Sequence, residues 1–285
     1  MNENISFGGS YNIPLQEGFR EAYLLHLADN ALILGQRNAE WCGHGPVLEQ
    51  DIAITNISLD LIGQARNFYQ YASLLYNNFS EKEKEAVDYL MPRPWKNYNR
   101  ELNEDDLAFL RDEYQYLNLL ITELPNGDWA QTTLRQFLFS AYQQLLYTQL
   151  QKSDDEQLAA IAEKSLKEVA YHLRWSSEWV IRLGDGTDKS HQRISDALNE
   201  LWTFTPEMFT PASYEQIDLS LLKNDWQKTV NKIFEEATLT SPFSSGAGEG
   251  PGVRSAGKEG QHTEYLGYIL TEMQYLQRVY PNSQW

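Results

Sequence analysis

The stretch "LADNALILGQRNAEWCGHGPVLEQDIAITNISLDLIGQARN", residues 27–67, joins two helical patterns through one short break. Before the break, apolar residues recur at steps of three and four, which predicts a helix over residues 15–38. The break contains two glycines and Pro46, and proline suits the first turn of a following helix. The same apolar spacing then resumes and predicts a helix over residues 47–77. Because the connection is short, we expect the two helices to be antiparallel.

A second pair of long helical patterns follows at residues 129–151 and 156–183. Asp128 precedes the first of them and can cap it. A long excursion, residues 78–128, links the two pairs, and within it "NEDDLAFLRDEYQYLNLLITEL", residues 103–124, also reads as helix. Two helical hairpins joined by a long crossover form the arrangement of ferritin-like proteins. The sequence therefore predicts an all-α, ferritin-like four-helix bundle.

The C-terminal third adds further helical patterns around residues 190–203, 213–237 and 262–279. A glycine- and serine-rich loop, residues 242–261, separates the last of these helices from the others. We find no Val/Ile/Thr-rich alternating segment that would predict a strand. We therefore expect residues 1–285 to form a single ferritin-like helical domain with additional C-terminal helices.

The composition narrows the class of partner. The chain has 285 residues, of which 42% are apolar, and its 40 acidic and 23 basic side chains give a net charge of −17. This balance argues against nucleic acid and anionic membranes as partners, because no dense basic face can form. There is no run of about 18 apolar residues and no signal-peptide pattern at the N-terminus. With one cysteine, Cys42, no intrachain disulfide can form, and we expect a cytoplasmic protein.

The fourth bundle helix tests whether the fold holds a di-iron site. Ferritin-like di-iron proteins take one Glu from each of two helices and Glu-x-x-His from each of the other two. His172 is present, but Val169 stands three residues before it and Glu168 stands four before it. The spacing is therefore wrong by one residue. We interpret His172 as a half-buried histidine paired with Glu168, not as a metal ligand.

The second and third bundle helices also lack the required ligands. A Glu-x-x-His template placed on the second helix falls on Leu61 and Gln64. We expect Gln64 to be buried and hydrogen-bonded, because an unpaired buried amide is costly. Asp60 and Arg66 can supply charge pairs nearby. The third helix contains no Asp or Glu from residue 129 to residue 153, and neither a serine nor a glutamine can replace a bridging carboxylate. The sequence therefore predicts no metal bound by this chain. The degenerate ligand positions are Leu61, Gln64, Ser140, Val169 and His172.

Three separated motifs carry a family resemblance that spans nearly the whole chain. They are residues 27–67, quoted above, "KEVAYHLRWSSEWVIRLGDGT" (167–187) and "HTEYLGYILTEMQYLQRVYPNSQW" (262–285). These motifs resemble the non-catalytic ferritin-like subunit of bacterial ring-1,2-phenylacetyl-CoA epoxidase, the PaaC family. The resemblance implies a structural subunit in aerobic phenylacetate catabolism.

In the complex that the resemblance implies, a homologous di-iron subunit performs the epoxidation with O2 and electrons from NADPH. The resemblance implies a heterotetramer with two copies of each subunit, and contact with further components, including the reductase, is a hypothesis. The alternative is a metal-binding ferritin-like oxidase active in its own right. A third class, an all-α adaptor unrelated to oxygenases, requires the three motif matches to be coincidental.

Two further features are candidates for contact with a ligand or a partner. Arg254 and Lys258 lie in the glycine-rich loop, and such loops can bind the phosphates of CoA or a partner, although no phosphate-loop motif is present. Trp175 and Trp179 lie four residues apart on one helix and indicate an aromatic face, packed in the core or anchoring an interface. Cys42 is expected to be a packed thiol in the turn between the first two helices.

Overall fold

The computed structural model describes residues 19–215, 217–240, 256–281 and 283, and over these residues it is all-α, without a strand. This confirms the predicted fold class. Residues 15–18 of the first predicted helix lie outside the described residues. No helix among those described combines the length and the apolar character that crossing a membrane requires.

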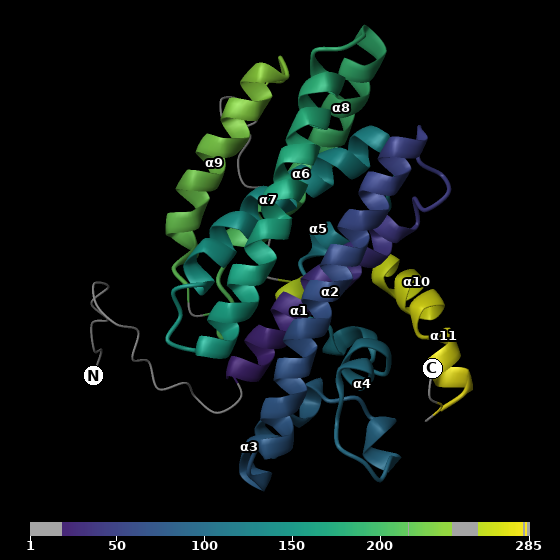
Figure 1. The fold of residues 1–285 in the computed structure, drawn as a ribbon, viewed down its shortest axis with the longest axis vertical. Helices are drawn as coiled ribbons and strands as arrows, with labels where there is room; N and C mark the ends of the chain where they lie inside the picture. The colour runs from purple at the N-terminus through teal and green to yellow at the C-terminus, as the bar shows by residue number, and fades with distance from the viewer. Residues whose placement is uncertain (1–18, 216, 241–255, 282, 284–285) are drawn as a thin grey trace.

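Four long helices form the bundle (Figure 1). They are α1 (Phe19–Ala39), α2 (Leu48–Asn78), α6 (Trp129–Leu150) and α7 (Glu156–Gly184). The most extensive packing is within the pairs α1–α2 and α6–α7, and α2 also packs against α7. The expected ranges 47–77, 129–151 and 156–183 correspond to α2, α6 and α7. The structure thus has two helical hairpins packed side by side.

Local chemistry explains where the second hairpin begins. The carboxylate of Asp128 accepts hydrogen bonds from the amides of Ala130 and Gln131, which caps α6 as the sequence predicts. Asp155 caps α7 in the same way. Residues 21–35 of α1 and residues 132–143 of α6 are all buried, so both helices are enclosed on every side over these stretches instead of being amphipathic. One helix of each hairpin therefore lies at the centre of the core.

The crossover between the hairpins contains less helix than predicted. Its elements are α3 (Glu81–Val87), the 3-10 turns η1 (Asp88–Leu90) and η2 (Trp95–Asn97), α4 (Glu104–Phe109), the 3-10 turn η3 (Glu113–Gln115) and α5 (Leu120–Glu123). The prediction of one helix over residues 103–124 is therefore wrong. Residues 116–119 are not helical, because the amides of Leu117 and Leu119 donate to the side chains of Asp29 and Asn30 on α1 instead of to backbone carbonyls.

The C-terminal third covers the bundle. It contains α8 (Asp188–Leu201), the 3-10 helix η4 (Trp202–Phe209), α9 (Leu219–Glu236), the 3-10 turn η5 (Gly257–Glu259), α10 (Glu264–Met273) and α11 (Tyr275–Val279). Helices α8 and α9 pack on α6 and α7, whereas α10 packs on α1 and α5 (Figure 1). The helix predicted over residues 213–237 begins later, at Leu219, and the one predicted over 262–279 is divided at Gln274.

Candidate functional site at the bundle centre

The five degenerate ligand positions are all buried, and they come from three helices. Their side chains are at most 1% exposed: Leu61, Gln64, Ser140, Val169 and His172. Leu61 and Val169 contribute apolar side chains to the core, at positions where a metal site would require carboxylates. The polar members do not form one cluster; they divide into three separate sets of hydrogen bonds.

Four side chains form a hydrogen-bonded series that we call the glutamine chain: Tyr147, Gln143, Gln64 and Glu168. The amide nitrogen of Gln143 donates to Gln64 Oε1 and to the Tyr147 hydroxyl, in each case over 3.0 Å. The amide nitrogen of Gln64 donates to Glu168 Oε2 over 2.9 Å. The glutamine chain therefore links α6, α2 and α7 through the bundle centre. This confirms that Gln64 is a buried, hydrogen-bonded group.

His172 has a different partner from the one predicted. Its Nε2 lies 3.0 Å from Oδ2 of Asp60 on α2, whereas Glu168 is bonded to Gln64. The prediction of a His172–Glu168 pair is therefore wrong, and so is the expectation that His172 is only half-buried, because its side chain is fully buried. The physical reason is that both side chains reach across to α2, where each finds a partner that its own helix cannot offer. Asp60 therefore lies near the centre, as expected, with the imidazole of His172 as its partner.

Arg66 and Ser140 lie apart from the glutamine chain. Arg66 is exposed and its Nε lies 3.3 Å from Glu104 Oε1 on α4, so the expected charge pair at the centre is instead a surface contact with the crossover. Ser140 accepts a hydrogen bond from Gln136 on its own helix, and Gln136 Oε1 accepts one from Asn38 on α1. This third set of hydrogen bonds connects α6 to α1.

The donor set at the bundle centre does not fit a di-iron centre. Two bridged iron ions need several carboxylates to neutralise their charge. The centre offers neutral amides, a phenol, a hydroxyl group, the imidazole of His172 and two partly exposed carboxylates, those of Glu168 and Asp60, on one helix each. Within the described ranges, no three His, Cys, Asp or Glu side chains converge in a way that could hold a metal ion. The chemistry that this arrangement supports is hydrogen bonding between helices.

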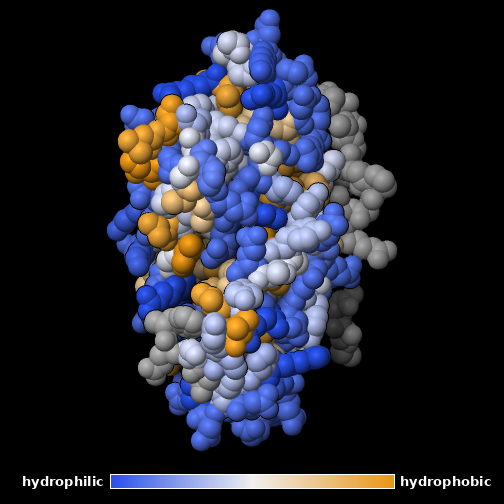
Figure 2. Space-filling model, turned by 90° about the vertical axis from the view of Figure 1, so that its right-hand side faces the viewer, coloured by the Kyte–Doolittle hydropathy of each residue, from blue (hydrophilic) through white to orange (hydrophobic). Residues whose placement is uncertain are grey.

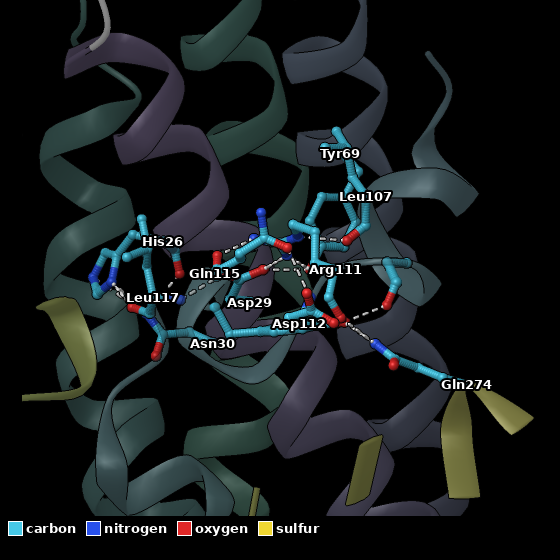
Figure 3. Close-up of polar contacts among 12 residues, drawn as sticks. His26, Asp29, Asn30, Tyr69, Leu107, Arg111, Asp112, Gln115, Leu117 and Gln274 are labelled. Atoms are coloured by element: carbon cyan, nitrogen blue, oxygen red, sulfur yellow. Dashed lines mark hydrogen bonds and ion pairs between the residues drawn. The ribbon is translucent and has the colours of Figure 1, made fainter. Parts of the chain in front are cut away.

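A second buried polar cluster, which sequence reasoning missed, lies where the crossover meets α1 (Figure 3). We call Asp29, Asn30, Tyr69 and Arg111 the crossover network. Arg111 forms a two-pronged ion pair with Asp29, with Nη1 3.1 Å from Oδ2, and both side chains are fully buried. Tyr69 of α2 donates its hydroxyl to the same carboxylate. The sequence signal was present, because Asp29 and Asn30 interrupt an otherwise apolar helix.

The crossover network extends to the C-terminal helices. Gln274, between α10 and α11, donates its amide nitrogen to the carbonyl of Arg111 over 2.9 Å, as Figure 3 shows. Nearby, Glu123 lies 2.9 Å from Nδ1 of His262, and both side chains are buried. Burial alone would lower the pKa of His262, but the bond to Glu123 and its charge raise it. Buried charges therefore attach the C-terminal segment to the crossover.

The structure places Lys258 in the interior. Its side chain is 1% exposed, and its Nζ lies 2.8 Å from Glu215 Oε2 and 2.9 Å from the carbonyl of Thr210. Lys258 therefore offers no free ammonium group to CoA or to a partner at the surface, contrary to the expectation for this loop. Burial lowers its pKa, whereas the adjacent carboxylate of Glu215 acts to raise it. Arg254 and most of the glycine-rich loop lie outside the described residues.

Trp175 and Trp179 belong to an aromatic cluster at one end of the bundle. Both donate their indole N–H to Oε1 of Gln50 on α2, over 3.0 and 2.8 Å. Both also lie edge to face against Trp129, which in turn lies edge to face against Trp41. The pair thus packs into the hairpin–hairpin junction and leaves little surface for an interface. Cys42 is exposed instead of packed, because the turn that carries it points outward.

The geometry defines a class of protein: a ferritin-like bundle whose centre is closed by hydrogen bonds between amides, a phenol and a carboxylate. Comparison with known proteins identifies the family. Residues 17–285 match the family described as "Phenylacetic acid catabolic protein", and the chain belongs to this family. It is also similar to the C subunit of 1,2-phenylacetyl-CoA epoxidase from Escherichia coli (strain K12). The identity is 45% over 275 residues, which cover 93% of this chain and 98% of that relative.

Proposed function

We propose that the chain is a structural, non-catalytic subunit of a multicomponent phenylacetyl-CoA 1,2-epoxidase that acts in aerobic phenylacetate catabolism. The observation that carries the proposal is the glutamine chain, which occupies the position where a catalytic bundle needs carboxylates. The similarity to the C subunit of an epoxidase supplies the reaction and its context. In this proposal the chain holds no metal of its own.

The proposed partner is a homologous subunit that carries the di-iron centre. That subunit would epoxidise the aromatic ring with O2 and electrons from NADPH, delivered through a reductase. We propose a cytoplasmic heterotetramer with two copies of each subunit. A net charge of −17 supports protein partners over nucleic acid or an anionic membrane. The alternative, an oxidase active in its own right, would need a donor set that the bundle centre lacks.

The chain's proposed contribution is rigidity that does not depend on iron. The glutamine chain links α6, α2 and α7, and the crossover network links α1, α2 and the crossover. A bundle held in this way keeps its outer faces in one arrangement whether or not metal is available. Such a face can hold the partner's helices, and through them its iron ligands, in a preorganised geometry.

Iron content per chain tests this proposal. The full chain is loaded anaerobically with excess Fe(II), desalted and assayed for iron, alone and together with the purified di-iron subunit. We expect less than about a tenth of an iron per chain alone, because the donor set leaves the metal charge uncompensated. His172→Ala is the matched control and should leave this background unchanged. A content close to two irons per chain alone would contradict the proposal and favour the oxidase alternative.

A further inference from the structure

The outward face of α2 exposes more apolar surface than a solvated helix needs. Five aliphatic residues at its start or along it are at least half exposed: Val47, Leu48, Ile52, Leu59 and Leu74. Positions 48, 52, 59 and 74 are separated by close to whole numbers of helical turns, so their side chains lie on one side of α2. Figure 2 looks onto the side of the molecule where the loop between α1 and α2 lies, and hydrophobic side chains gather along one margin of that face.

Gly63, on the same outward face, indicates that this stripe receives another helix. A glycine inside a helix costs roughly 1 kcal/mol relative to alanine. At Gly35 on α1 the chain itself supplies the reason, since a Cβ there would lie 3.2 Å from Ile62 and Leu61 of α2. At Gly63 a Cβ would meet no heavy atom within 4 Å, and the residue is exposed. The close approach that Gly63 permits is not used within the described chain.

We infer that the outward stripe of α2, from Leu48 to Leu74 with Gly63 within it, is the surface on which the homologous helical subunit docks. The inference rests on the proposed function for the identity of that partner. The stripe spans ~39 Å of helix at a rise of about 1.5 Å per residue. At a width of ~10 Å, the diameter of one helix, the stripe has a footprint of ~390 Å2, about half of the ~800 Å2 that one partner contributes to a standard interface.

Charge selects a different subunit over a second copy of this chain. Each copy carries a net charge of −17, so self-association would bring together two molecules of the same high negative charge. Asn56, Arg66 and Gln70 interrupt the aliphatic residues of the stripe. Two of these polar residues are already engaged, because Arg66 and Gln70 both bond to Glu104 of the crossover. The complementary surface is therefore an apolar helix face on a less acidic helical subunit.

The test measures the dissociation constant between the full chain and the purified di-iron subunit, for the wild type and three variants. Leu59→Arg places a charge in the stripe and should weaken binding at least about 30-fold, the effect of losing a central anchor. Gly63→Leu should weaken binding about 10-fold, as expected for a lost close contact between helices. The Tm of the free chain should stay the same or rise in this variant, because open space surrounds position 63. Leu221→Arg, at an equally exposed leucine on α9, is the matched control and should change the constant less than about 2-fold.

The outcomes separate the two proposals. If the wild type binds and the two stripe variants bind equally well, the docking surface is wrong while the proposed function stands. If the wild type does not bind the di-iron subunit at all, the proposed function fails, and the inference fails with it. The remaining possibility is that a second copy of this chain binds the stripe. Sedimentation of the chain alone tests it. A dimer that the Leu59→Arg variant dissociates would show self-association through the stripe and overturn the inference.

Discussion

The glutamine chain and the crossover network are both buried, both polar and both shared between helices, yet they differ in charge. The glutamine chain consists of neutral groups with one carboxylate, Glu168, at its partly exposed end. The crossover network contains a carboxylate and a guanidinium, Asp29 and Arg111, that water does not reach. The crossover network therefore balances its buried charges within itself, whereas the glutamine chain has little charge to balance.

The largest effect should come from removing one partner of the buried ion pair. Asp29→Ala leaves the Arg111 guanidinium buried without a counter-charge and removes the acceptor for the amide of Leu117. We expect a loss of roughly 3–5 kcal/mol in the free energy of unfolding, measured by urea denaturation. The control is Asp106→Ala, which also breaks an ion pair, but with Arg100, whose side chain is 36% exposed and can turn to water. Equal losses of stability in the two variants would contradict the view that the burial of Arg111 makes the loss of its counter-charge more costly.

The glutamine chain should give a smaller effect. Gln143→Leu leaves the Tyr147 hydroxyl and the Gln64 carbonyl without the donor that joins them. We expect a loss of roughly 1–3 kcal/mol in the free energy of unfolding, again from urea denaturation. The double variant Gln64→Leu/Gln143→Leu should lose less than the sum of the two single variants, because both partners of one hydrogen bond disappear together. Strict additivity would mean that the two glutamines do not act as a unit.

A pH dependence of the free energy of unfolding should arise beside the crossover network. Burial raises the pKa of Glu21 to about 8, although Arg111 and Arg20 act to lower it. The folded state therefore holds a proton that the unfolded state releases, so stability is present below about pH 4.5 and is lost as the pH rises to about 8. We expect Glu21→Gln to remove a slope of up to ~1.4 kcal/mol per pH unit from the free energy of unfolding between about pH 5 and 8.

A second buried carboxyl group serves as an internal reference for the pH dependence of the free energy of unfolding. Glu207, whose pKa burial raises to about 7, contributes a separate slope of the same sign, so some pH dependence should survive in Glu21→Gln. Urea denaturation at several pH values from about 5 to 9 resolves both contributions. If the Glu21→Gln variant kept the full slope of the wild type, the carboxyl group of Glu21 would not be protonated in the folded chain.

The helices of the bundle could be predicted because each is long and its apolar spacing reports directly on burial. The crossover could not be predicted in this way. Residues 103–124 have helical spacing, but the side chains of Asp29 and Asn30, 88 and 89 positions away, take the amides of Leu117 and Leu119. No local pattern records a competitor so distant in sequence. The polar residues Asp29 and Asn30, within a mainly apolar part of the first helix, were the local sign of it.

The candidate site could also be predicted from the sequence only in part. The absence of carboxylates on the third helix and the burial of Gln64 follow from residue identity and periodicity alone. The partners of individual side chains do not, because Glu168 and His172 are neighbours on one helix but both pair across to α2. Lys258 is a similar case: it follows a glycine-rich stretch, and only the fold reveals that Glu215 receives its ammonium group.

The extended residues 116–119 also bear on the order in which the chain folds. Their hydrogen-bond acceptors, Asp29 and Asn30, are separated from them by 88 and 89 positions. Contacts over such separations form late, since the intervening chain must first be closed into a loop. The hairpin of α1 and α2 has a short connection, residues 40–47, so it can form early and present both side chains. We expect the amides of Leu117 and Leu119 to gain protection from hydrogen exchange after those of the hairpin, with the crossover settling onto a surface that is already built.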